Sequence, residues 1–301
     1  MKISIVICTL SNYTGLEKVL ESINKQKILP WEIIVVHGDI NDETKRICNE
    51  WNNKGLTVIY LKAERSLVIQ RNIGINKSTG DIICFFDDDI ILDNDYFEGI
   101  VKAYKSNEAI GGVQGTITNL SNLKFSRILL SKIFLLEEIY GNGKIKRSGT
   151  PSFHKPINEI AEVQVFNGCQ MTFRADIIKK IKFDSWYNDY WYGDDFETSF
   201  AVSKVYKLLQ IPDSRLIHEG NASSERSPKI AFMVGLNYRY IREKYNLYKG
   251  FGKIICMWSD IGRILLYIGY MLSKGDGTYL NKWIKGNLKY SKLKKLNNFK
   301  N

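Results

Sequence analysis

The 301-residue sequence lacks the signatures of several common protein classes. No GxxxxGKS or GxxxxGKT segment occurs, and "TLSNYTG" follows the first apolar segment where a dinucleotide-binding fold requires GxGxxG, so neither a P-loop nor a Rossmann cofactor site is supported. The five cysteines form no CxxC pair, and Met1 to Leu10 runs straight into a strand-like pattern without a signal-like segment. We therefore expect free thiols and a cytoplasmic protein.

Long uncharged apolar runs are missing as well. A membrane-spanning helix needs about 20 apolar residues, and Lys253, Asp260 and Arg263 interrupt the most apolar stretch, Phe251 to Leu272. We therefore expect no spanning helix in this part of the chain. The stretch is still rich enough in Ile, Leu, Tyr and Trp to lie along a membrane surface.

Acidic residues are scarce near the C-terminus. Residues 230–301 contain 14 Lys and Arg but three Asp and Glu, whereas residues 1–229 contain 29 of each charge, so the C-terminal quarter carries the whole net charge of +11. A basic amphipathic segment binds anionic lipid. We predict that residues 228–301 form a basic, amphipathic helical extension. It lies either on an anionic membrane surface, peripheral on the inner face of the cell membrane, or packed on the preceding domain with a solvated basic face.

The rest of the chain alternates strand-like and helix-like patterns. Apolar strand patterns and amphipathic helix patterns follow one another from "KISIVICTL" to "DIICFF", over residues 2–86. This alternation predicts an α/β fold with a doubly wound, mostly parallel sheet and helices on both faces. Further on, "FSRILLSKIFLLEEIY" (125–140) predicts one helix, and "VQVFNGCQMTFRADIIKKI" (163–181) predicts a strand, a glycine turn, a strand and a helix.

Three consecutive acids, Asp87, Asp88 and Asp89, follow the apolar run of residues 82–86. Ligands bind at the carboxyl ends of the strands in such sheets, where Thr9 and Asp39 also fall. In an extended segment Asp87 and Asp89 point to the same side, where two hard oxygen donors can meet one Mg²⁺ or Mn²⁺. We predict a divalent metal between these carboxylates and a diphosphate. The alternative is a solvated acidic turn.

A second acidic pair, Asp194 and Asp195, follows a glycine and precedes a helical pattern. The dipole at a helix N-terminus tolerates anions, and helix capping alone accounts for an Asp there. Capping does not account for the aromatic residues just before the pair, which predict a partly apolar pocket able to raise the pKa of a carboxylate toward general-base duty. These aromatic residues are Trp186, Tyr187, Tyr190, Trp191 and Tyr192.

Six segments of the sequence together resemble the family 2 glycosyltransferases with the GT-A fold, over about residues 1–225. In chain order they are "SIVICTLSNYTGLEKVLESINKQ", "WEIIVVHGDINDET", "RNIGINKSTGDIICFFDDD", "FNGCQMTFRADI", "GDDFETSFAVSK" and "IHEG". The ordered set is far more specific than any one of its members, because short acidic triplets occur by chance.

The resemblance implies roles for individual residues. Thr9 and Leu10 match the loop whose backbone meets the nucleotide base and ribose, and Arg71 matches a basic residue near the base and the diphosphate. Asp87 and Asp89 match the two acids of the DxD motif, the first directed toward the ribose and the last toward the metal.

Further residues follow from the same resemblance. Asp88 belongs with Asp87 to the nucleotide site, and His218 matches a position that holds the metal or diphosphate in some members, with a structural role as an equal alternative. Asp195 matches the second acid of the family's "ED" pair, the catalytic base that deprotonates an acceptor hydroxyl. Asp194 stands where Glu is usual.

One segment departs from the family pattern. In "HGDIND", His37 and Gly38 replace the acids that read the nucleobase, and Asp39 is displaced by one position. Asp39 remains a candidate base contact if the turn shifts, and Arg226 is a candidate diphosphate contact, although loop arginines mostly face solvent. We favour a UDP-sugar donor, with dTDP- and GDP-sugars as alternatives.

The resemblance thus implies an inverting, metal-dependent glycosyltransferase that moves a sugar from a nucleoside-diphosphate sugar to a hydroxyl of a saccharide acceptor, lipid-linked, in surface polysaccharide synthesis. The GT-A domain would span residues 1–227, with a nucleotide-binding half of about 1–115 and an acceptor-binding half of about 116–227. A sugar nucleotidyltransferase is the alternative, although "TLSNYTGLEK" lacks its glycine-rich basic motif. A nucleic-acid-binding protein would explain the basic tail, but acidic clusters repel phosphates, so we expect no nucleic acid.

Overall fold

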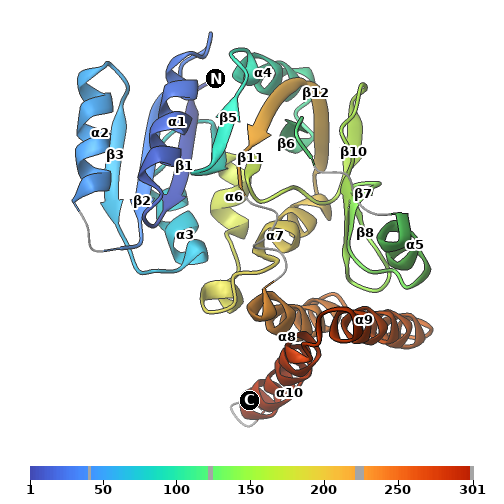
Figure 1. The fold of residues 1–301 in the computed structure, drawn as a ribbon. Helices are drawn as coiled ribbons and strands as arrows, with labels where there is room; N and C mark the ends of the chain where they lie inside the picture. Colours follow the sequence, from blue (N-terminus) through green and yellow to red (C-terminus); the bar gives the residue numbers. More distant parts are fainter. Residues whose placement is uncertain (40–41, 121–124, 221–226, 299–301) are drawn as a thin grey trace. The chain divides into compact units, whose positions relative to one another are not determined.

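A computed structural model describes residues 1–39, 42–120, 125–220 and 227–298 (Figure 1). The chain forms two compact units. Unit 1 comprises Met1–Ser121 and His154–Gly220, and unit 2 comprises Asn122–Phe153 and Asn221–Asn301. This division differs from the predicted boundary at residue 227, because residues 122–153 group with the C-terminal helices.

Unit 1 is built on a nine-stranded sheet with the strand order β10-β12-β6-β11-β4-β1-β2-β3, and β5 pairs with β12. The strands β1 to β4 pair in parallel, whereas β11 runs antiparallel between β4 and β6. The strand bounds are β1 (Ile3–Thr9), β2 (Glu32–His37), β3 (Val58–Lys62), β4 (Ile82–Asp87), β5 (Ile90–Leu92), β6 (Ile110–Ile117), β10 (Ala161–Val163), β11 (Gln170–Arg174) and β12 (Lys207–His218).

Helices cover both faces of this sheet. Ile3, Ile5 and Ile7 of β1 point to one face, where they share a core with α1, α2 and α4, while α3, α6 and α7 pack on the other. On that second face α3 approaches β1 through Gly74, where a Cβ atom would lie 2.3 Å from Cγ1 of Val6. The helices are α1 (Tyr13–Asn24), α2 (Glu43–Asn53), α3 (Leu67–Lys77), α4 (Tyr96–Ser106), α6 (Ala175–Ile181) and α7 (Asp194–Ser203), with a 3₁₀ turn, η1 (Ser185–Asn188).

The predicted fold class is confirmed. The mostly apolar strands β1, β2 and β4 are buried on both sides, as a sheet covered by helices on two faces requires. The helical C-terminal extension is confirmed too, as α8 (Pro228–Lys244), α9 (Gly252–Lys274) and α10 (Thr278–Asn298).

The single helix predicted over residues 125–140 is wrong. Helix α5 (Phe125–Ile133) ends early, Leu135 takes a left-handed φ of 51°, and β7 (Glu138–Gly141) forms instead. Strand β7 joins a three-stranded sheet with β9 (Pro151–His154) and β8 (Lys144–Ile145). Strand pairing satisfies the backbone groups that a continued helix would have satisfied internally.

Buried ion pairs explain why residues 122–153 belong with the C-terminal helices. Glu137 accepts hydrogen bonds from Arg263 of α9 and from the hydroxyl of Tyr238 of α8. Arg242 of α8, 2% exposed, donates to the carbonyl of Ser148 at 2.8 Å and to Asp260 of α9 at 2.8 Å. An unpaired buried charge is costly, so these pairs hold residues 122–153 and the C-terminal helices together.

Helix α9 is longer and more continuously apolar than the sequence analysis expected. Among the described residues it is the one helix long and apolar enough to cross a membrane by length and composition, with 23 residues and a mean hydropathy of 1.3 over its best 18-residue window. The expectation of no such helix rested on the charges of Lys253, Asp260 and Arg263. Asp260 and Arg263 form ion pairs with Arg242 and Glu137 inside unit 2.

Candidate active site

The carboxyl ends of β1 and β4 lie side by side, with Cys8 beside Asp87 in the parallel register. Asp88 folds back onto β1, where its carboxylate accepts a hydrogen bond from the hydroxyl of Thr9 at 2.5 Å and one from the amide of Asn12 at 3.1 Å. Burial raises the pKa of Asp88 to about 6, although both hydrogen bonds oppose the rise. Thr9 and Asp88 therefore meet where the sequence predicted them.

Asp87 and Asp89 lie close to His218, so an imidazole joins the two carboxylates as a possible metal ligand. The chain turns at residues 88–89 between β4 and β5, so the predicted extended geometry of the triplet is wrong. The two acids nevertheless group with His218, because β5 pairs antiparallel with the end of β12 and sets His218 beside Ile90. Ligating atoms of Asp87, Asp89 and His218 all lie within 4.8 Å of one another.

This cluster fits a divalent cation. The Oδ1 atom of Asp89 is buried and accepts no hydrogen bond from the described residues, with Nε2 of His218 3.1 Å away. A Cβ atom at Gly220 would lie 2.6 Å from Oδ2 of Asp89 and 2.8 Å from Nε2 of His218, so the glycine keeps this space open. Carboxylate oxygens are the donors that Mg²⁺ and Mn²⁺ prefer.

Arg71 connects the two acidic clusters. This residue of α3 is 3% exposed, and its guanidinium donates to Asp194 at 2.6 Å and to the carbonyl of Gly168 at 3.1 Å. The same group lies 3.5 Å from Oδ1 of Asp87. The resemblance implied that Arg71 contacts the nucleobase and the diphosphate. In the structure its guanidinium contacts the protein groups Asp194, Gly168 and Asp87.

The acidic pair opens helix α7. Gly193, with a φ of 99°, begins the turn into the helix, and Asp194 and Asp195 occupy its first turn. Burial raises the pKa of Asp194, opposed by the guanidinium of Arg71. Burial also raises the pKa of Asp195, opposed by the backbone N–H of Phe196 and then by Arg71.

Asp195 and Asp194 differ in exposure. Asp194 is buried, whereas Asp195 is half-buried and lies against the backbone of Gly168. A Cβ atom at Gly168 would lie 2.9 Å from Oδ2 of Asp195, so a side chain there would displace the carboxylate. Asp195 thus combines partial access with a raised pKa, the properties that a general base needs.

The departure from the family pattern has a structural explanation. His37 is fully buried at the end of β2, with Nε2 2.5 Å from the carbonyl of Leu10 and Nδ1 3.2 Å from the hydroxyl of Tyr60. Asp39 accepts a hydrogen bond from the hydroxyl of Ser11 at 3.2 Å. The loops that follow β1 and β2 are therefore joined, and Leu10 and Asp39 lie in the same corner.

Sequence reasoning missed three contributors. Asn12 holds Asp88 and also accepts a hydrogen bond from the backbone of Gly15, a capping role that its place before an amphipathic helix could have revealed. Gly168 and Gly220 lie in the quoted segments "FNGCQMTFRADI" and "IHEG", but the sequence did not indicate that they leave space beside Asp195 and Asp89. The predicted contact residue Arg226 lies outside the described residues.

Comparison with known proteins identifies the family. The sequence model described as "Glycosyl transferase family 2" matches residues 4–181, more than half of the chain. The chain belongs to the family 2 glycosyltransferases. It is therefore a glycosyltransferase, which was the first of the three protein classes considered from the sequence.

One curated relative of this family 2 glycosyltransferase is the glucosyl-dolichyl phosphate glucuronosyltransferase of Haloferax volcanii. The two are 29% identical over 120 residues, which are 39% of this chain and 38% of the relative. The chain thus matches well under half of that relative's length.

Solved structures share the GT-A fold. Residues 1–349 of Staphylococcus aureus TarS, solved in complex with UDP-GlcNAc, have a TM-score of 0.62 at 16% identity, covering 95% of this chain and 79% of that solved chain. The mannosyltransferase PcManGT of Pyrobaculum calidifontis, in complex with GDP-Man and Mn²⁺, has a TM-score of 0.56 at 14% identity, covering 96% and 86%. At these identities the likeness shows the fold.

The position of Arg71 generates the first prediction. We expect Arg71→Met to lower the free energy of unfolding by about 3–5 kcal/mol, because it removes one partner of a buried ion pair and leaves the buried Asp194 carboxyl without it. Urea denaturation measures the change. Arg46→Met is the matched control, since Arg46 pairs with Glu43 and Glu50 on the surface, where solvent screens such pairs and their contribution to stability is small. Equal effects of the two substitutions would contradict the bridging role.

Proposed function

We propose that this family 2 glycosyltransferase is an inverting, metal-dependent enzyme that transfers a sugar from a nucleoside-diphosphate sugar to a hydroxyl of a lipid-linked saccharide. The observation that supports it most is the joining of two acidic clusters by Arg71, one of which fits a cation while the other offers a carboxylate with a raised pKa. A single displacement needs both beside one donor.

In the proposed mechanism Asp195 acts on the acceptor. Its ionised carboxylate takes the proton from the acceptor hydroxyl while that oxygen forms a bond to the anomeric carbon of the donor sugar. The bond from the anomeric carbon to the diphosphate breaks on the opposite side, and the electron pair leaves with the diphosphate. One displacement inverts the configuration at the anomeric carbon.

A second set of residues serves the leaving group. A divalent cation held by Asp87, Asp89 and His218 would supply Lewis-acid stabilisation of the negative charge on the departing diphosphate. We assign Mg²⁺ or Mn²⁺ to this place; PcManGT, which shares the fold, was solved with Mn²⁺. Thr9, Leu10, Asp39 and Asp88 line the adjoining strand ends, where we place the nucleoside.

The choice of substrates draws on the similar proteins. TarS was solved with UDP-GlcNAc and PcManGT with GDP-Man, so this fold accepts either nucleobase, and we keep a UDP-sugar as the favoured donor. The Haloferax relative carries a dolichyl phosphate acceptor in its name, which supports a lipid-linked acceptor. An acceptor of that kind would bring the protein to the inner face of the cell membrane.

The base assignment is tested by Asp195→Asn. We expect the turnover number to fall by roughly 10²–10⁴-fold, the contribution of a general base, while the affinity for the nucleotide sugar stays within about twofold. Steady-state transfer assays and calorimetric titration with donor measure the two quantities. Asp189→Asn, an exposed acid of the preceding loop, serves as the control. Equal loss of donor binding and transfer would argue against the role.

The same assignment predicts a pH dependence. The pKa of Asp195 is raised above its ordinary value of 3.8, and the base works in its ionised form, so transfer should fall as the pH drops through that raised pKa. Asp194 also titrates above 3.8, so the acid limb belongs to the pair. The profile of kcat/KM against pH measures it. A limb centred at or below 3.8 would refute a raised pKa.

The metal site is tested without turnover. We expect Mn²⁺ and UDP together to raise the melting temperature, because ligand at about 100 times its Kd stabilises the native state by about 2.7 kcal/mol. Asp89→Asn should remove the Mn²⁺-dependent part of this rise, while Asp93→Asn, an exposed acid five residues from Asp88, should keep it. Thermal-shift measurement with EDTA as reference decides; the same rise in all three proteins would exclude Asp89 as a ligand.

A further inference from the structure

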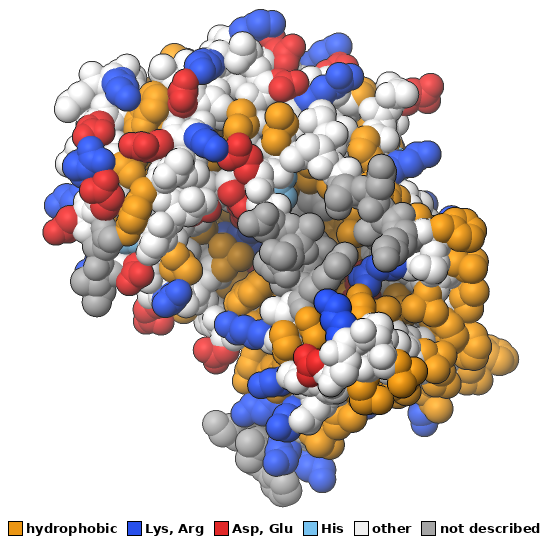
Figure 2. All heavy atoms as spheres, in the orientation of Figure 1, with side chains coloured by type: hydrophobic (Ala, Val, Ile, Leu, Met, Phe, Trp, Pro, Cys, Tyr) orange, Lys and Arg blue, Asp and Glu red, His pale blue; other side chains and the backbone are white. Residues whose placement is uncertain are grey.

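Unit 2 carries most of the large hydrophobic side chains that the described chain exposes, and Figure 2 shows them gathered over α9. Six of them occupy one face of α9 at helical spacing. They are Ile254, Met257, Trp258, Ile261, Leu265 and Leu272. Exposed apolar residues scattered singly are ordinary, but a continuous row along a 23-residue helix marks an interaction surface.

The inward face of α9 is unusually polar. Its buried residues are Cys256, Ser259, Gly262, Arg263 and Tyr267. Ser259 and Arg263 thus lie inward beside Cys256 and Tyr267, whereas the large aliphatic side chains of the row face outward, unlike the usual surface helix. No charged residue stands on the outward row itself, and Lys253 and Lys274 flank it at the two ends.

Helix α5 extends the same surface. Phe125, Leu129 and Ile133 lie four residues apart on its exposed side, and Phe125 is 77% exposed. The indole N–H of Trp258 donates to the carbonyl of Ile133 at 2.8 Å, and the Trp258 ring stacks on Phe134 with centroids 4.7 Å apart. We call the exposed rows of α5 and α9 together the apolar face.

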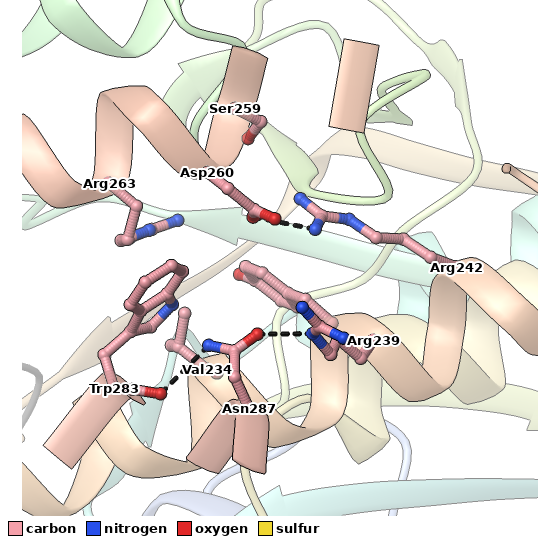
Figure 3. Close-up of a pocket in the computed structure, with 10 residues that line it drawn as sticks. Val234, Arg239, Arg242, Ser259, Asp260, Arg263, Trp283 and Asn287 are labelled. Carbon is pink, nitrogen blue, oxygen red and sulfur yellow. Dashed lines mark hydrogen bonds and ion pairs between the residues drawn. The ribbon is translucent and has the colours of Figure 1, made fainter. Parts of the chain in front are cut away.

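The charges of α9 are satisfied on the opposite side. Figure 3 shows Asp260 directed toward Arg242 across a small cavity between α8, α9 and α10. The cavity has about 10 Å³ of space for water, enough for about one molecule and too little for a ligand. Arg263 pairs with Glu137. These pairs tie α9 to unit 2 on one side and leave its other side for a partner.

The charge of unit 2 indicates which kind of partner the apolar face binds. Unit 2 also exposes lysines on α10, where Lys282, Lys285, Lys289 and Lys292 accompany the exposed Ile284 and Leu288. Acidic residues are scarce, since Glu243, Asp260 and Asp276 are the three in residues 230–301. An apolar face in a unit with exposed lysines and few acids complements an anionic lipid leaflet, whose headgroups attract lysine while its acyl region accepts apolar side chains.

We propose that the apolar face of α5 and α9 inserts into one leaflet of an anionic membrane, with α9 lying in the plane of the membrane. Insertion in plane keeps the Arg242–Asp260 and Arg263–Glu137 pairs intact, whereas a spanning α9 would carry Asp260 and Arg263 into hydrocarbon without them. The inference deepens the proposed function, on which its link to a lipid-linked acceptor rests, and it adds α5, which lies outside the basic tail.

Vesicle flotation of the full chain tests the proposal. We expect the wild-type protein to float with phosphatidylcholine vesicles that contain phosphatidylglycerol and to float less with phosphatidylcholine alone. The double variant Ile254→Asn with Leu272→Asn should bind roughly tenfold more weakly, because it removes two exposed apolar side chains from the inserted face. Sodium carbonate should release the bound wild-type protein, as it releases proteins that do not span the membrane.

The matched control replaces two apolar residues that are about as exposed as Ile254 and Leu272. Ile160 is 63% exposed, as is Ile254, and Val205 is 73% exposed where Leu272 is 79%. Ile160→Asn with Val205→Asn, both in unit 1, should leave flotation within about twofold of the wild type. Lys285→Glu with Lys289→Glu should remove the preference for phosphatidylglycerol, while Lys45→Glu with Lys54→Glu should keep it.

Several outcomes would overturn the proposal. Absence of flotation, or flotation that both double asparagine variants reduce equally, would remove the apolar face from membrane binding. Resistance to carbonate would indicate that α9 spans the bilayer. Self-association in sedimentation velocity that only Ile254→Asn with Leu272→Asn abolishes would assign the face to a second copy of the chain. Flotation needs no turnover, so a failed transfer reaction and a failed membrane contact remain distinguishable.

Discussion

The candidate site depends on one buried guanidinium. The guanidinium of Arg71 lies 2.6 Å from Asp194 and 3.5 Å from Asp87, so this one side chain pairs with an acid of β4 and an acid of α7. Without it, several carboxylates would face one another in a partly dry space, where like charges and lost hydration both favour protonation. The shared cation lets Asp87 and Asp195 remain close while still able to ionise.

Unit 2 follows a different constraint. Helix α9 buries Arg263, and Arg242 of α8 is buried against it, each in an ion pair, while a row of large apolar side chains on α9 stays exposed. In water such an arrangement leaves apolar area exposed without any gain. It becomes favourable once a lipid leaflet covers the apolar face, so the packing of unit 2 and its proposed partner explain each other.

Much of the fold could be predicted from the sequence, because β1, β2 and β4 are continuous apolar runs and α1 has a clear amphipathic period. The acidic site was predictable in place but not in shape: Asp87 and Asp89 group around a turn, which long-range pairing of β5 with β12 imposes. Pairing between distant segments leaves no local signal, and this also explains the wrong helix over residues 125–140. The role of Arg71 beneath the site required coordinates, since a basic residue in a helix pattern does not reveal which way it points.

Leu10, His37 and Asp39 lie together where β1 and β2 end, and His37 stands where the family pattern has an acid. The carbonyl of Leu10 can only accept a hydrogen bond, so Nε2 of His37 must carry a proton, while Nδ1 lies 3.2 Å from the hydroxyl of Tyr60. An acid at position 37 could not donate to that carbonyl, and it would bring a buried charge. The ring of His37 contacts Leu10 and Tyr60, so Asp39 supplies the carboxylate at the ends of these strands. The displaced acid and the buried histidine are thus two parts of one rearrangement.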